Sequence, residues 1–316
     1  MNPKKPLLSI CIPTYNRCEY LKKSIESIIS QKEFSDEDVE IVISDNCSTD
    51  DTRMICKQYE DKYKNFHYYK NEVNIKDKNF PTVIGKANGV YRKLCNDTLL
   101  FNSNALFNIV KTVKENLEEK PVLFFINNNT DNKYFNSLSE FLKIVSFNIT
   151  WIGAFGVWED FCDGIENNYE GCSESLWQVP FMLNYIAQKR KGIVIGESFC
   201  QTQKVEKKNI SYGLYKVFYV NFLSFINQSV ENGQIPQKTY DRIEKDLLLN
   251  FFPSWIYSFE KQDKTLDYSK EEDLKNCICT AYKGKWYFGL FKIKYAVLKF
   301  EIFIKGKIRK ILKYGI

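Results

Sequence analysis

The chain has 316 residues, 44% of them hydrophobic and 16% aromatic, which excludes wholesale disorder and exceeds the length of one ordinary domain. A single histidine, His67, excludes catalytic triads and metal centres that are built on histidine. The formal net charge is +6, but residues 283–313 hold ten Lys and Arg and one acid, so the rest of the chain is near −3 and we expect no nucleic-acid partner.

Apolar runs alternate with helical patterns over the first 130 residues. The runs suit strands that are buried on both faces, and they span residues 7–12, 39–44, 66–70, 90–95 and 121–126. Helices are expected between them, around residues 21–29, 55–63, 79–88 and 104–118. Strands that alternate with helices predict an α/β fold with a doubly wound, mostly parallel sheet.

The later part of the chain is less regular and then becomes helical. Residues 131–210 contain a helical pattern at 175–188 and a strand at 192–198. From residue 211 onward the patterns are long and helical, without strand signals. The expected organisation is a first domain of residues 1–210, with the halves 1–130 and 131–210, and a helical C-terminal region of residues 211–316.

Polar side chains follow three of the predicted strands. They are Thr14 to Arg17, then Asp45 and Asn46, and then Asn96 and Asp97. In a parallel sheet of this kind, a ligand lies at the carboxyl ends of the strands, so the sequence predicts a binding site there. The first cluster offers more than a turn needs, because it combines a hydroxyl, an aromatic face, an amide and a cation.

These stretches resemble a known family. SICIPTYNR and EIVISDNCSTDDT, followed by YYKNEVNIKDKNF and KANGVYRKLCND, are similar to the opening of glycosyltransferase family 2 domains, which have the GT-A fold. The resemblance covers residues 7–127 and extends to about residue 200. It implies an inverting, hexosyltransferase-type enzyme that takes its sugar from a nucleotide-diphosphate donor, most commonly a UDP-sugar. The implied acceptor is a glycan or a lipid-linked oligosaccharide in surface polysaccharide synthesis.

The resemblance also implies which residues bind the nucleotide. They are Pro13, Thr14, Tyr15, Asn16, Arg17, Asp45, Asn74, Asn79 and Asn96. Tyr15 is expected against the base and Arg17 near the phosphates. Asp45 is expected to accept the base N–H, because this strand-end carboxylate has no other obvious partner. For Asn74 and Asn79, capping of a loop is an equally good explanation.

The metal motif departs from the family. Members usually show two or three acids after the fourth strand, whereas Cys95-Asn96-Asp97-Thr98 contains one. Asp97, with an oxygen from Asn96 or Thr98, is expected to act in catalysis as a weak ligand for Mg²⁺ or Mn²⁺, because the diphosphate supplies further oxygens. The reduced motif leaves an alternative open, namely an inactive GT-A domain that binds a carbohydrate or a partner.

The catalytic base is expected in the second half of the first domain. Inverting members carry an acid at the start of a helix that precedes a short strand, which points here to Glu174. Pro180 complicates this assignment, because a proline inside the helix would kink it unless the helix begins after Glu174. Asp160 and Asp163 are the competing acids.

The basic C-terminal segment predicts an amphipathic helix. One face holds Trp286, Phe288, Phe291, Tyr295, Leu298 and Ile302. Flanking lysines suit an anionic membrane surface, although packing of the helix on the protein explains the face equally well. No run resembles a signal peptide or a membrane span, and the ten cysteines are scattered through apolar runs as reduced thiols would be. We therefore expect a cytoplasmic protein that is peripheral at the inner face of the cell membrane.

Overall fold

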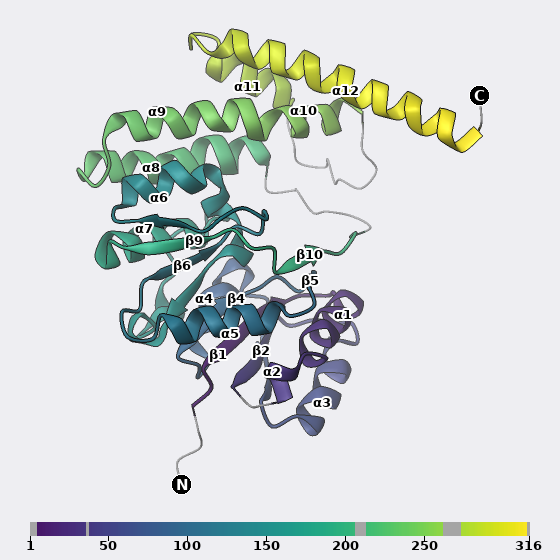
Figure 1. The fold of residues 1–316 in the computed structure, drawn as a ribbon, viewed down its shortest axis with the longest axis vertical. Coiled ribbons are helices and arrows are strands. Elements are labelled where there is room, and N and C mark those ends of the chain that lie inside the picture. The colour runs from purple at the N-terminus through teal and green to yellow at the C-terminus, as the bar shows by residue number, and fades with distance from the viewer. Residues whose placement is uncertain (1–4, 36–37, 206–212, 262–272, 315–316) are drawn as a thin grey trace. The chain divides into compact units, whose positions relative to one another are not determined.

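The computed structural model describes residues 5–35, 38–205, 213–261 and 273–314 (Figure 1). Its internal contacts divide the chain into two compact units, Met1–Lys204 and Val205–Ile316. All ten cysteines are unpaired.

The main sheet of the first unit has five strands in the order β3-β2-β1-β4-β8. Their bounds are β1 (Leu8–Thr14), β2 (Val39–Asp45), β3 (Phe66–Lys70), β4 (Tyr91–Leu94) and β8 (Gly156–Trp158). The first four are mutually parallel, and β8 runs antiparallel to β4. The predicted mostly parallel sheet is confirmed, with every residue of β2 buried as its apolar run requires.

The strand at residues 121–126 does not extend this sheet as the alternating pattern suggested. It is β6 (Val122–Phe125), which pairs in a three-stranded sheet with β9 (Gly192–Ile195), itself paired with β7 (Lys133–Phe135). A bridge between Phe124 and Phe155 links β6 to the residue before β8. A further antiparallel pair joins β5 (Leu99–Phe101) to β10 (Cys200–Thr202).

Helices connect the strands of the first unit. Their bounds are α1 (Cys18–Ile29), α2 (Lys32–Ser35), α3 (Thr52–Lys62), α4 (Asn79–Gly85), α5 (Ala105–Glu115), α6 (Leu138–Val145) and α7 (Gln178–Lys189), with short 3₁₀ turns η1 (Lys76–Lys78), η2 (Ser146–Thr150), η3 (Ile152–Ala154), η4 (Glu159–Phe161) and η5 (Ile165–Asn167). Leu21, Ile25 and Ile28 of α1 are buried, as the predicted stripe requires. Because α7 begins at Gln178, Pro180 lies in its first turn, where no N–H is needed.

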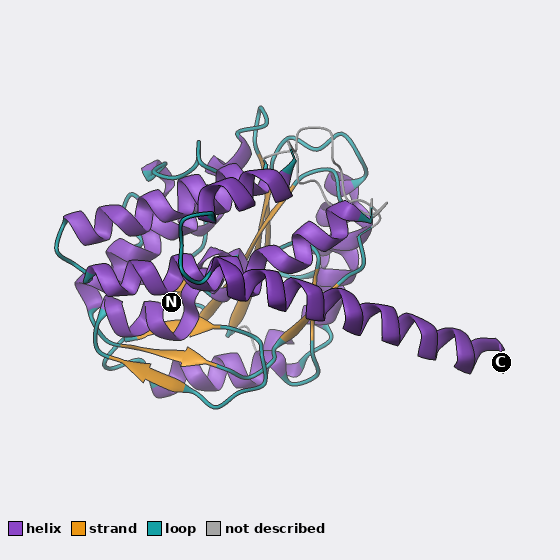
Figure 2. Cartoon of the chain, turned by 90° about the horizontal axis from the view of Figure 1, so that it is seen from above, coloured by secondary structure: helices purple, strands orange, loops and turns teal. Residues whose placement is uncertain are grey.

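The described part of the second unit consists of helices, without strands (Figure 2). Their bounds are the π-helical η6 (Tyr215–Asn221), α8 (Phe222–Glu231), α9 (Gln237–Asp246), the π-helical η7 (Leu247–Phe251), α10 (Phe252–Glu260), α11 (Leu274–Tyr282) and α12 (Phe288–Tyr314). The π-helical turn before α10 has a local cause, because Pro253 lacks an N–H and disturbs the turn before it. Within the described residues, no helix is both long and apolar enough to cross a membrane.

Candidate active site

The turn after β1 is held by the loop that follows β2. Asn16 has a left-handed backbone (φ 50°), which asparagine tolerates better than most residues. Its backbone N–H donates to Ser48 Oγ at 2.9 Å, and its side-chain oxygen accepts from the Thr49 N–H at 2.8 Å. The turn therefore has a fixed conformation in which Tyr15 remains 44% exposed.

Asp97 joins the ends of β1 and β4. Its carboxylate accepts hydrogen bonds from Thr14 Oγ1 at 2.9 Å and from Arg17 Nη1 at 3.1 Å. Burial raises the pKa of the Asp97 carboxyl, and the neighbouring Arg17 and Thr14 offset only part of that effect. The Arg17 side chain is 42% exposed, so its positive charge reaches the surface while it pairs with the buried Asp97. Residues from two of the predicted strand-end clusters thus meet at one place.

Asp45 has partners that the sequence did not show. It is fully buried, and its carboxylate accepts from the Ser48 N–H at 2.8 Å and from the Tyr68 hydroxyl at 2.7 Å. The reason for assigning it to the base, namely the lack of another partner, is therefore corrected. Each oxygen already accepts one hydrogen bond, so Asp45 first of all orders the loop after β2.

Besides Asn16, the other three predicted asparagines differ in their surroundings. Asn79 is 3% exposed, and its side chain accepts from Ser44 Oγ at 2.6 Å and donates to the Ser44 carbonyl at 2.8 Å. Asn74 is exposed and caps its own loop by accepting from the Lys76 N–H at 2.9 Å. Asn96 Oδ1 is buried beside Asp97 without a hydrogen-bond partner among the described residues. A buried oxygen without a hydrogen-bond partner costs free energy, so Asn96 Oδ1 is available to interact with a bound ligand.

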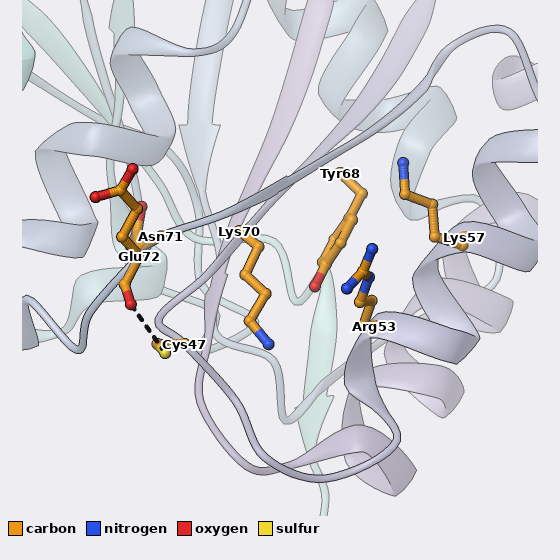
Figure 3. A pocket seen from close by; sticks show the side chains of 7 residues that line it. All are labelled: Cys47, Arg53, Lys57, Tyr68, Lys70, Asn71 and Glu72. Carbon is orange, nitrogen blue, oxygen red and sulfur yellow. Dashed lines mark hydrogen bonds between the residues drawn. The ribbon is translucent and has the colours of Figure 1, made fainter.

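A basic pocket lies beside Asp45. It has a volume of about 430 Å³ and is lined by Cys47, Arg53, Lys57, Tyr68, Lys70, Asn71 and Glu72 (Figure 3). Lys57 is paired with Glu60, and Lys70 donates to the Ser48 carbonyl at 2.9 Å. Arg53 lies next to Tyr68, whose hydroxyl reaches Asp45. The pocket thus presents three cations and one acid at the carboxyl end of β3.

Comparison with known proteins supports a family assignment. Residues 9–159 match the model of Glycosyl transferase family 2. Abequosyltransferase RfbV of Salmonella typhimurium is 47% identical over 88 residues, which are 27% of this chain and 26% of that protein. Thr14, Arg17, Asp45 and Asp97 are inside the family match. Residues 9–159 belong to glycosyltransferase family 2.

Solved structures confirm the architecture of this family 2 domain and its helical extension. S. aureus TarS in complex with UDP-GlcNAc matches with a TM-score of 0.55 at 15% identity, over 89% of this chain and 93% of that one. The mannosyltransferase PcManGT of Pyrobaculum calidifontis, in complex with GDP-Man and Mn²⁺, matches with a TM-score of 0.52 at 13% identity, over 93% and 87%. The GT-A fold is confirmed. RfbV is matched over only about a quarter of its length.

The three acids considered as the base all lie beyond the family 2 match. Glu174 sits in the turn before α7 and accepts from Ser173 Oγ at 2.8 Å. Asp160 forms an ion pair with Lys189 at 2.8 Å, and Asp163 is exposed in a loop. Burial raises the pKa of the neighbouring Cys172 to about 11, and the charges of Asp77 and Glu174 contribute to the rise. Lys78 Nζ of η1 lies 4.5 Å from the centre of the Tyr169 ring, so the loop that leads to Glu174 passes close to η1.

Two residues of the family 2 domain were missed by the sequence reasoning. Burial raises the pKa of Asp77 in η1 to about 6, with Lys76 opposing the shift. Tyr68 supplies the hydroxyl that holds Asp45. The alternation of FHYYK was a signal for Tyr68, because it places that side chain on the buried side of β3, whereas no pattern in the sequence marked Asp77.

The residues at the end of β4 offer a sparse set of metal ligands. Across the residues that the structure describes, no group of three or more His, Cys, Asp and Glu could hold a metal ion. What is present is the Asp97 carboxylate, shared with Arg17, and the partnerless Asn96 Oδ1. Two hard oxygen donors fit Mg²⁺ or Mn²⁺ when the ligand adds its own oxygens, but they do not make a site by themselves.

Proposed function

We propose that the chain transfers a sugar from a nucleoside-diphosphate donor, a UDP-sugar by preference, to a glycan or lipid-linked oligosaccharide during synthesis of a surface polysaccharide. The observation that carries the proposal is the cluster of Thr14, Arg17 and Asp97 at the strand ends, inside the family 2 match. It joins a buried acid to a surface guanidinium, which is suited to a diphosphate. That RfbV is an abequosyltransferase, and that TarS binds UDP-GlcNAc, support a sugar donor of this class.

The nucleoside is proposed to lie along the edge formed by the ends of β1, β2 and β3. Tyr15 offers an exposed ring for the base, and Pro13 and Thr14 offer backbone groups of the same turn. The three cations of the neighbouring pocket, Arg53, Lys57 and Lys70, raise the local concentration of an anionic donor. Asp45 contributes by fixing the loop through Ser48 and Tyr68.

A weak site for Mg²⁺ or Mn²⁺ is proposed at Asp97 and Asn96. When bound, the cation neutralises charge on the departing diphosphate. Arg17 shares Asp97 with that site, so ligand binding frees its guanidinium to pair with a phosphate oxygen. In this arrangement Thr14 continues to hold the carboxylate in place.

The reaction is proposed to be a single displacement with inversion. The acceptor hydroxyl oxygen forms a bond to the anomeric carbon, and the bond from that carbon to the diphosphate oxygen breaks. Glu174 takes the hydroxyl proton, and the electron pair of the broken bond leaves with the nucleoside diphosphate beside Arg17. Glu174 is preferred to Asp160 because it precedes α7 and β9, the helix and short strand before which the resembling family carries its acid.

The place of action is proposed to be the cytoplasmic face of the cell membrane, where a lipid-linked acceptor would be met. The alternative is a GT-A domain that binds a carbohydrate or a partner without catalysis, which the single acid after β4 favours. Both readings require a ligand at the strand ends, but only the first requires turnover.

Thermal-shift measurements test the proposed donor. UDP, GDP, CDP and dTDP are added with Mn²⁺ to the wild type and to Tyr15→Ala, since a ligand of the native state raises the melting temperature by mass action. At least one nucleotide should stabilise the wild type, and Tyr15→Ala should weaken its affinity by about 1–3 kcal/mol through lost stacking. If none of the four changes the melting temperature, the proposed donor class is wrong.

A further inference from the structure

Helix α12 has one apolar face that is packed within the second unit. Phe291 and Tyr295 on this face are 3% and 6% exposed, and the Tyr295 hydroxyl donates to Glu260 of α10 at 2.6 Å. Lys294 donates to Asn250 Oδ1 of η7 at 2.8 Å. This is the face that the sequence suggested for a membrane, except that Trp286, which the sequence placed on it, is 77% exposed. Its packing shows that any surface for a membrane must lie elsewhere on the helix.

A second apolar face lies on the opposite side of α12. We call it the outer stripe, and it consists of Leu290, Ile293, Val297, Phe300 and Ile304. These side chains are 43%, 63%, 49%, 65% and 37% exposed. Steps of three and four residues place them on one line along the helix. Trp286, which is 77% exposed, lies two residues before the start of the helix. A continuous line of large exposed apolar side chains indicates an interaction surface, whereas isolated ones would not.

The charges around the outer stripe indicate what covers it. Lys292 and Lys299 flank it on one side, and Lys294 lies on the other with Glu301, the sole acid of residues 283–313. All three lysines are exposed. The sequence of residues 305–313 adds five more basic residues and no acid. A second copy of the chain would bring the same positive charges to the same stripe, which disfavours a dimer through it. An anionic surface is complementary to it.

We infer that the outer stripe of α12 binds the surface of a membrane that contains anionic lipids. The helix lies in the plane of the interface, with the stripe between the acyl chains and the lysines at the level of the headgroups. This inference rests on the proposed location at the cell membrane, but it does not depend on the proposed transfer reaction. It also replaces the face that the sequence suggested with the one that the structure leaves exposed.

Vesicle flotation tests this inference. The full chain is mixed with vesicles of phosphatidylcholine alone or of phosphatidylcholine with phosphatidylglycerol. Ile293→Ser/Phe300→Ser removes two apolar side chains from the outer stripe. Val220→Ser/Phe107→Ser is the matched control, because it removes an exposed branched residue and an exposed phenylalanine elsewhere. Deleting the whole helix is less suitable, because it would uncover the contacts of Phe291 and Tyr295.

The wild type and the control should float with the anionic vesicles and much less with the neutral ones, and added salt should weaken binding. The stripe variant should bind the anionic vesicles at least about tenfold more weakly. Thermal shifts by nucleotide, measured on all three proteins, should stay equal, so a failed donor proposal would not be confused with a failed membrane proposal. Equal flotation of the stripe variant would overturn the inference. So would light scattering that shows a wild-type dimer converted to a monomer by the stripe substitutions.

Discussion

At the scale of single residues, Asp97 has the most demanding environment in the proposed site. It is almost completely buried, yet it lies between a hydroxyl and a guanidinium that both stabilise its charge. Burial of a carboxylate costs free energy unless a positive charge pairs with it. For Asp97 that charge comes either from Arg17 alone or from a metal cation that also binds a diphosphate. The two possibilities differ in their response to a chelator.

Asp97→Asn should remove the dependence of nucleotide affinity on Mn²⁺ while it preserves the fold, since an amide oxygen still accepts from Thr14 Oγ1. Calorimetric titration of UDP, with Mn²⁺ and with EDTA, is the measurement. Asp163→Asn is the control, because Asp163 is an exposed acid outside the cluster. A wild-type affinity that EDTA leaves unchanged would refute the metal site and leave the charge of the diphosphate to Arg17.

Glu174→Gln should reduce turnover by at least about 10²-fold, because glutamine keeps the size of the side chain but cannot accept the acceptor proton. Nucleotide affinity should change little. Asp160→Asn and Asp77→Asn provide the comparison, since the first acid is paired with Lys189 and the second lies in η1. Near-normal turnover in Glu174→Gln, with a collapse in either of the others, would move the role of base to that residue.

His67 of β3 forms a pH-dependent pair with Glu40 of the neighbouring strand β2, and the distance from His67 Nε2 to Glu40 Oε2 is 3.3 Å. The hydrogen bond to Glu40 raises the pKa of His67 against the opposing effect of burial. Burial would raise the pKa of Glu40, but hydrogen bonds from His67, Ser9 and Asn88 outweigh it and leave that pKa lowered. The contribution of His67 is therefore complete below its unfolded pKa of about 6.5 and disappears as the pH rises through the raised value.

His67→Gln should accordingly destabilise the protein most between about pH 5 and 6.5, where both partners are charged, and progressively less toward pH 9. The difference should stay below about 1 kcal/mol, because solvent reaches the imidazole and screens the pair. Urea unfolding of both proteins at pH 6 and at pH 9 measures it. A difference that grows with pH would show that His67 stabilises the fold as a neutral group.

At the scale of elements, Asn79 at the start of α4 fastens that helix to the end of β2. It satisfies both the hydroxyl and the carbonyl of Ser44, and its oxygen also accepts from Asn71 Nδ2 at 2.9 Å. Asn79→Ala should therefore lower the free energy of unfolding by about 1–3 kcal/mol, because it leaves buried polar groups without partners. Asn74→Ala, at an exposed position, should have little effect. Equal urea midpoints for the two variants would contradict this.

The strands that support the site were predictable, as were the later strands β6 and β9, whereas β8 was not. The apolar runs at β1 and β2 are buried on both faces, so composition alone identifies them. The position of β8 depends on its antiparallel pairing with β4, and the three residues Gly156 to Trp158 are too short to show a period. For α12 the sequence contains two apolar faces, and the contact between Tyr295 and Glu260 decides which one is packed.

The same distinction applies to the site. Thr14, Arg17 and Asp97 could be predicted to meet, because strand ends in a parallel sheet converge. The partner of Asp45 could not, since the hydrogen bond from Tyr68 depends on the register between β2 and β3. Glu174 stays a prediction, because it lies in an irregular turn whose position no periodic pattern specifies.

At the scale of the whole molecule, the proposed donor site belongs entirely to the first unit and the outer stripe to the second. We therefore propose that nucleotide binding and membrane binding are separable. This division gives the C-terminal region a function that does not require it to touch the donor.

Release of nucleoside diphosphate in the absence of acceptor distinguishes an active glycosyltransferase from a domain that only binds its ligand. A working glycosyltransferase slowly hydrolyses its donor, so the wild type should release nucleoside diphosphate from at least one of a set of UDP-, GDP-, CDP- and dTDP-sugars. Glu174→Gln should release it at least about 10²-fold more slowly. A wild type that binds one of these donors but releases no product from any of them would contradict the account and identify the chain as a binding protein.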